Sequence, residues 1–123
     1  MRLINPLDCP PQNPSFSQAA VSGDIVYVAG QIGIGQGGQL AGPDVRAQTR
    51  QIFANAACVL ASAGSSLDRT VRVTVYMVDL GEWAEMNEVY VEEFAGHAPP
   101  KTTVQVSGLA LGARLEIEFT AET

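Results

Sequence analysis

Positive charge and long apolar runs are scarce in this sequence. Its 123 residues carry 7 Lys and Arg against 13 Asp and Glu, a formal net charge of −6. An acidic chain is repelled by a phosphate backbone, and no cluster of Lys and Arg offsets this, so we expect no nucleic-acid partner. No stretch of the chain reaches the roughly 18 apolar residues that a membrane-spanning helix needs. We therefore expect no membrane segment either.

Cysteine and histidine are equally rare. The two cysteines, Cys9 and Cys58, do not make a disulfide framework, so we expect free thiols in a reducing compartment. The first residues lack the apolar stretch of a signal peptide, and this favours the cytoplasm. His97 is the single histidine and no Cys-x-x-Cys is present, so we expect no metal site. His97 stands beside a proline-rich segment and is predicted to be an exposed loop residue.

The remaining composition is that of one globular domain spanning residues 1–123, with 46% hydrophobic residues. Four prolines predict an extended arm at residues 1–14. Apolar periodicity predicts helices and strands along the rest of the chain. The helices are expected at residues 44–63 and 82–94, and the strands at residues 24–30, 71–78, 102–107 and 114–121.

Both predicted helices and two of the predicted strands have one apolar face. In the first helix this face holds Ile52, Ala56, Val59, Leu60 and Ala63, and in the second Trp83, Met86, Tyr90, Val91 and Phe94. In the strands it holds Val71, Val73, Val75 and Met77, and then Leu115, Ile117, Phe119 and Ala121. Two helices can cover only one face of such a sheet. The other face is mixed in polarity, which predicts contact with another subunit.

Two charged positions could carry chemistry. Glu116 and Glu118 lie two apart on one face of a strand, where carboxylates are usually just solvated. If that face is buried between subunits, burial raises a carboxyl pKa and makes a general acid or base. Lys101 opens a strand after two prolines and could bind a carboxylate, although most lysines are only solvated.

Several sequence blocks, taken together, resemble the RidA family of reactive-intermediate deaminases, also called the YjgF or endoribonuclease L-PSP group. They follow the family order over roughly residues 15–120. The blocks are FSQA at 16–19, VYVAGQI at 26–32, QTRQ at 48–51, AGSSLD at 63–68, VTVY at 73–76, MNEVY at 86–90, TTVQV at 102–106 and LEIE at 115–118.

The resemblance implies an α+β fold like that of chorismate mutase, with a six-stranded mixed sheet and two helices on one face. It also implies a homotrimer with a central barrel and clefts between subunits. Typical members hydrolyse enamine or imine intermediates to a 2-keto acid and ammonia, without a metal or cofactor. The expected partner is therefore a small molecule that carries a carboxylate.

The family site carries over only in part. Glu116 matches the family residue that orients or activates the attacking water. Asn87 matches a residue that forms a polar wall of the site, and Gly30 matches one whose backbone approaches the ligand closely. Lys101 stands where an arginine is typical, and lysine lacks the planar fork that grips a carboxylate twice. One lost charge-assisted bond, ~1.5–3 kcal/mol, predicts about 10- to 100-fold weaker binding.

Three further positions depart from the family, and two of them, Phe16 and Ala29, make the cleft more apolar. Phe16 stands where the family usually has a tyrosine, and Ala29 where it often has a serine. Thr103 stands where a cysteine is common, and its backbone N–H could still donate a hydrogen bond. These changes leave several functions open. One is a deaminase with a substrate other than 2-aminoacrylate-type imines, and another is a trimer that binds a ligand without turnover. A ribonuclease or translation inhibitor is disfavoured by the acidic charge and the single histidine.

Overall fold

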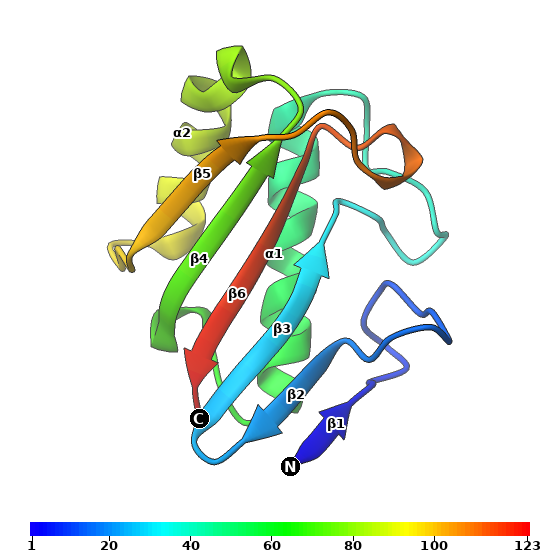
Figure 1. Ribbon diagram of the computed structural model, residues 1–123, viewed down its shortest axis with the longest axis vertical. Coiled ribbons are helices and arrows are strands. Elements are labelled where there is room, and N and C mark those ends of the chain that lie inside the picture. The colour runs from blue at the N-terminus through cyan, green and yellow to red at the C-terminus, as the bar shows by residue number, and fades with distance from the viewer.

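Six β-strands form one sheet, and two α-helices lie against one of its faces (Figure 1). The computed structural model describes residues 1–123. The strand order is β1-β2-β3-β6-β4-β5, with β4 and β5 parallel and all other neighbours antiparallel. The strands are β1 (Arg2–Ile4), β2 (Ala19–Ser22), β3 (Ile25–Gln31), β4 (Thr70–Met77), β5 (Lys101–Gln105) and β6 (Leu115–Glu122). The helices are α1 (Val45–Ser62) and α2 (Trp83–Phe94), with short 3-10 turns at Leu67–Arg69, Leu80–Glu82 and Ala110–Gly112.

This architecture confirms the predicted α+β class, the mixed sheet and the two helices on one face. The predicted arm at residues 1–14 is corrected at its start, because β1 lies within it and pairs with β2 through Ile4 and Ala19. The two strands contain 3 and 4 residues. Segments this short show too little alternation for periodicity to identify them.

Helix α1 follows the predicted boundaries closely. Asp44 is extended and its side chain accepts a hydrogen bond from the backbone N–H of Ala47, which makes it the N-cap. The predicted apolar stripe is buried, with Ile52 and Leu60 fully enclosed. Its packing against the sheet gives the molecule its second layer. No helix of the chain has the length and apolar content needed to cross a membrane.

Helix α2 buries a slightly different stripe from the predicted one. Met86, Tyr90 and Phe94 are in the core as expected. Trp83 and Val91, however, are 41% and 59% exposed, so their prediction as core residues was wrong. Helix α2 lies behind β4 and β5, at the β5 edge of the sheet (Figure 1). The exposed Trp83 and Val91 leave part of this helix open to solvent.

A register shift in β4 corrects one further residue. The pairing with β6 changes between Thr70 and Arg72, as in a β-bulge. Thr70 therefore points into the core and Val71 points outward, against the simple alternation predicted for this strand. From Val73 onward the alternation holds.

An aromatic cluster centred on Phe53 joins the helices to the sheet. Its ring contacts those of Tyr90, Phe94 and Phe119 edge-on, with centroids 5.5, 5.0 and 5.5 Å away. Edge-to-face contacts at these distances are the favoured aromatic geometry. The cluster fixes α1, α2 and β6 relative to one another.

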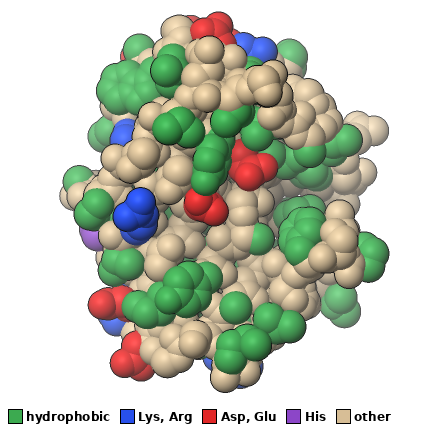
Figure 2. All heavy atoms as spheres, in the orientation of Figure 1, with side chains coloured by type: hydrophobic (Ala, Val, Ile, Leu, Met, Phe, Trp, Pro, Cys, Tyr) green, Lys and Arg blue, Asp and Glu red, His purple; other side chains and the backbone are tan.

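The sheet face away from the helices is uncovered and mixed in character. Glu116, Glu118 and Tyr76 are half-buried on it, while Tyr27 is 53% exposed. Figure 2 looks onto this face and shows acidic side chains in its middle, among hydrophobic and neutral atoms. The predicted open face is therefore present in the single chain.

The two cysteines form a disulfide, so the prediction of free thiols was wrong. Cys9 in the arm and Cys58 in α1 are bonded, with Cα atoms 5.8 Å apart. Their sequence separation of 49 residues hid this proximity. Asp8 lies beside both sulfur atoms, but bonded sulfurs offer no thiolate to a metal ion.

Candidate functional site

Glu116 occupies a recess on the open face of the sheet. The alternation of β6 turns Leu115 and Ile117 into the core and Glu116 outward. Beside it, β3 is irregular between Val28 and Gln31, and Gly30 lies in this irregular segment. A Cβ at Gly30 would lie 2.9 Å from Cδ of Glu116, closer than real Cβ atoms come. A side chain at Gly30 would therefore force the Glu116 carboxylate to shift from this position.

The electrostatics of the recess favour a proton-transferring carboxyl group. Burial raises the pKa of Glu116, and the nearby Glu118 carboxylate raises it further. Glu118 accepts a 2.7 Å hydrogen bond from the hydroxyl of Tyr76. Glu116 makes neither a side-chain hydrogen bond nor an ion pair within the chain. It is therefore the free member of the pair.

The recess around Glu116 has a volume of about 520 Å³ and mostly apolar walls. Phe16 and Asn13 come from the arm, Ala29 and Gly30 from β3, and Leu111 from the turn before β6. Phe16 and Ala29 thus lie with Glu116 and Gly30 in one recess. A recess of this size is in the range of small-molecule sites.

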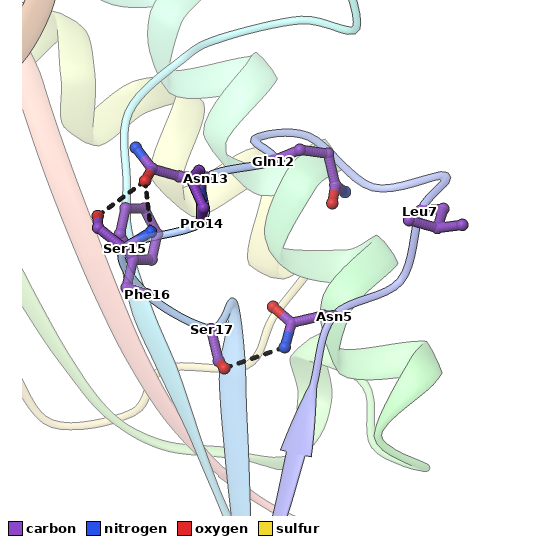
Figure 3. A pocket seen from close by; sticks show the side chains of 8 residues that line it. All are labelled: Asn5, Leu7, Gln12, Asn13, Pro14, Ser15, Phe16 and Ser17. Carbon is purple, nitrogen blue, oxygen red and sulfur yellow. Dashed lines mark hydrogen bonds between the residues drawn. The ribbon is translucent and has the colours of Figure 1, made fainter.

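The arm that forms one wall is folded by its own polar groups. Figure 3 shows the Asn13 side chain, whose Oδ1 accepts hydrogen bonds from the backbone N–H and the hydroxyl of Ser15, at 2.8 and 2.7 Å. Asn5 donates to Ser17 at 3.0 Å in the same view. The hollow of about 520 Å³ within the arm is lined by no titratable side chain, so it offers no acid or base. Asn13 and Phe16 line both this hollow and the recess around Glu116.

Lys101 lies in a second recess, on the helix-covered face. It pairs with Val73 at the start of β5, and its Nζ donates a 2.6 Å hydrogen bond to Oδ1 of Asn87. The ammonium group is 4.0 Å from the ring centroid of Tyr90 and 5.4 Å from that of Trp83. Burial lowers the pKa of Lys101, and no carboxylate pairs with it. An unpaired, partly desolvated cation of this kind can bind an anionic ligand.

The structure divides the predicted site residues into two groups. Lys101, Asn87 and Thr103 lie on the helix side, since Thr103 pairs with the buried Val75. Glu116 lies on the open side with Gly30, Ala29 and Phe16. Strand β4 lies between β5 and β6. On β4, Val73 pairs with Lys101, and Tyr76, three residues further along, pairs with Glu116. Strand geometry then puts the two Cα atoms about 14 Å apart, on opposite faces.

Two residues around Lys101 escaped the sequence-based prediction. Trp83 and Tyr90 were assigned to the core stripe of α2, and their apolar spacing gave no sign of a contact with Lys101. His97 was expected to be exposed but is half-buried. Its Nε2 lies 2.7 Å from the carbonyl oxygen of Thr70, and its ring contacts Phe94. These contacts anchor the loop that closes one end of the Lys101 recess.

Comparisons with known proteins identify relatives along the whole chain. The family model described as endoribonuclease L-PSP matches residues 8–123. A RutC family protein from Pyrococcus horikoshii is 40% identical over 107 residues, which cover 86% of this chain and 85% of the relative. A 2-iminobutanoate/2-iminopropanoate deaminase from Rattus norvegicus is 32% identical over 121 residues, covering 98% of this chain and 88% of the relative.

A solved structure agrees with these sequence matches. The crystal structure of E. coli TdcF with bound serine has a TM-score of 0.93 at 31% identity, covering 100% of this chain and 98% of that one. The resemblance to the RidA family drawn from the sequence blocks is thereby confirmed. The chain belongs to the endoribonuclease L-PSP family, in which RidA and YjgF proteins are grouped.

Proposed function

We propose that this protein hydrolyses the imines of 2-amino acids to 2-keto acids and ammonia. The observation that carries the proposal is Glu116, a half-buried carboxyl with a raised pKa and no partner, held against the backbone of Gly30. A group with these properties can take a proton from water near neutral pH and return it to a leaving nitrogen. A rat relative bears the name of such a deaminase.

The proposed reaction needs two protein groups. The carboxylate of Glu116 takes a proton from a water molecule whose oxygen attacks C2 of the imine, giving a tetrahedral carbinolamine. Glu116 returns this proton to the nitrogen, which completes the neutral carbinolamine. It then carries the hydroxyl proton of the carbinolamine to the same nitrogen, the C2–N bond breaks, and ammonia leaves as the C2=O bond forms. The ammonium group of Lys101 holds the substrate carboxylate in place throughout. Holding both reactants together supplies much of the rate.

The two groups can meet only across an interface, because one chain places them on opposite faces of its sheet. We propose that the site forms between copies of the chain, with Glu116 from one and Lys101 from its neighbour. The uncovered face of the sheet supports this assembly, and the trimer implied by the family resemblance is its expected form.

Ligand binding without turnover is the second candidate, and the Lys101 recess favours it. The lysine offers a single cation where a planar fork would bind a carboxylate twice. Phe16 and Ala29 add apolar surface beside Glu116 but no hydrogen-bond donor from their side chains. Tight binding of a 2-keto acid with no hydrolysis of any imine would be the result that selects this function.

A ribonuclease function finds no support in the residues of the site. His97 is engaged with a backbone oxygen, and the chain is acidic overall. Neither recess gathers the several cations that bind a phosphate backbone. Incubation with RNA should therefore give no cleavage above that of a Glu116→Ala control.

The decisive experiment generates an imine in the presence of the protein. Threonine dehydratase supplies 2-iminobutanoate, and the rate of keto-acid release is compared for wild type, Glu116→Gln and Lys101→Ala. We expect Glu116→Gln to lower kcat at least about 100-fold and Lys101→Ala mainly to raise KM. Glu118→Gln is the matched comparison: it lies on the same strand and face but bonds to Tyr76, so it should shift the pH dependence without the large loss of kcat. Equal rates for wild type and Glu116→Gln would refute the mechanism.

A further inference from the structure

An aromatic recess extends from Lys101 along the flank of α2. Its volume is about 350 Å³, and its walls come from α2, from the loop after it and from the start of β5. Apolar atoms dominate these walls, and Lys101 is the one Lys, Arg, Asp or Glu among them. The lining residues are Trp83, Asn87, Tyr90, Val91, Gly96, His97, Ala98, Pro99 and Lys101.

The walls of this recess have features that the fold does not need. Trp83 and Val91 are 41% and 59% exposed, although large apolar side chains on a helix normally face the core. The hydroxyl of Tyr90 is buried without a hydrogen-bond partner. A buried, unpartnered polar atom in a native protein calls for an explanation, and this hydroxyl belongs to a residue that lines the recess.

The position of the cation limits how a substrate can lie. C2 of a 2-imino acid bears a carboxylate, the C=N group and a side chain. A carboxylate held at Nζ of Lys101 and a C=N group turned toward a neighbour's Glu116 leave only the side chain free. The recess beside Lys101 is the apolar space next to that anchoring point.

We propose that this recess receives the side chain of the substrate, so that the preferred substrates are imines of 2-amino acids with large apolar or aromatic side chains. The inference rests on the proposed deaminase function and specifies its substrate class. A methyl group would leave most of the recess empty, whereas an isobutyl or benzyl group would displace water from the indole of Trp83 and from Val91. Apolar contact of this kind is worth at least about 10-fold in kcat/KM.

A set of three imines tests the proposal. D-Amino-acid oxidase supplies the imines of alanine, leucine and phenylalanine, and the loss of each imine is followed with and without the protein. For wild type we expect kcat/KM for the leucine or phenylalanine imine to exceed that for the alanine imine at least about 10-fold. A higher kcat/KM for the alanine imine would overturn the substrate class and leave the deaminase function standing.

Two variants that change the recess in opposite ways separate side-chain binding from effects on Lys101. Trp83→Ala removes one wall, and Ala98→Leu fills part of the space. Each should lower the ratio of the phenylalanine-imine to the alanine-imine kcat/KM at least about 10-fold. Leu80→Ala, an exposed apolar residue outside the recess, is the control and should leave the ratio unchanged. A uniform loss toward all three imines in both variants would contradict the proposal.

A binding measurement keeps the test independent of turnover. Phenylpyruvate and pyruvate present the same carboxylate with a large and a small side chain, and calorimetry gives the dissociation constant of each. We expect phenylpyruvate to bind wild type at least about 10-fold more tightly and to lose this advantage in Ala98→Leu. Equal affinities would refute the recess as a side-chain site, even if no imine is hydrolysed.

Discussion

Reducing the disulfide between Cys9 and Cys58 should lower the free energy of unfolding by at most about 4 kcal/mol. The bond joins residues 49 positions apart. Closing a loop of this length lowers the entropy of the unfolded chain by an amount that corresponds to about 4 kcal/mol. Measured effects of removing disulfides are commonly about 2–4 kcal/mol, because reduced unfolded chains retain some structure. The expected loss in the free energy of unfolding is therefore about 2–4 kcal/mol.

The folded arm should stay in place after reduction. Cys9 is fully buried, and its carbonyl oxygen accepts hydrogen bonds from the side chains of Gln12 and Gln18, both at 2.7 Å. These contacts do not depend on the sulfur–sulfur bond. The cost of reduction thus arises mainly in the unfolded state, and the Glu116 recess should keep its wall.

Urea unfolding at one fixed protein concentration measures this cost, since association with other copies also adds stability. Wild type is compared with and without a reductant, and titration of free thiols verifies the state of the bond. Cys58→Ala under the same two conditions is the control, because it has no bond to lose. An unfolding midpoint that is equal for oxidised and reduced wild type would refute the entropic argument. Free thiols in air-oxidised wild type would refute the pairing itself.

Three further predictions concern the divided site. Gly30→Ala should displace the Glu116 carboxylate and lower kcat at least about 10-fold. Gly35→Ala is the control and should leave kcat unchanged, because a Cβ there would lie 3.9 Å from its nearest atom. An unchanged kcat in both variants would show that Gly30 is not needed for catalysis. Glu118→Gln removes the like charge that raises the Glu116 pKa, so the acidic limb of the pH–rate profile should move to lower pH; a limb that stays in place would assign it to another group. Chains carrying Lys101→Ala, mixed by co-expression with equal amounts of Glu116→Ala chains, should recover about one quarter of wild-type clefts if each cleft takes one residue from each of two copies. No recovery of activity would place both residues of a working site in one chain.

Periodicity predicted most of the fold because burial follows it closely in the long elements. Helix α1 (Val45–Ser62) lies within one residue of the predicted range 44–63 at each end, and β6 alternates from Leu115 to Ala121 without interruption. The errors fall where local geometry departs from a simple period. The shift at Thr70 turned Val71 outward, and the 3- and 4-residue strands β1 and β2 offered too little pattern.

The sequence provided candidate site residues but not their arrangement in space. The sequence blocks identified Glu116, Gly30 and Lys101, and alternation alone implied that Glu116 faces the open side. The opposite orientation of Lys101 depends on the register between β4 and β5, which no local pattern encodes. The contact of Trp83 with Lys101 and the bond between Cys9 and Cys58 join distant segments, so they too required the folded chain.

The placement of Lys101 and Glu116 on opposite faces of one sheet has a consequence for gene duplication. When each cleft draws its cation from one chain and its carboxyl from another, two gene copies can each lose a different residue and still build a working assembly together. Neither copy is then dispensable, and selection acts on the pair. A homomeric ancestor with a site divided in this way can therefore give rise to an obligate heteromer through two single substitutions, without any change in the fold.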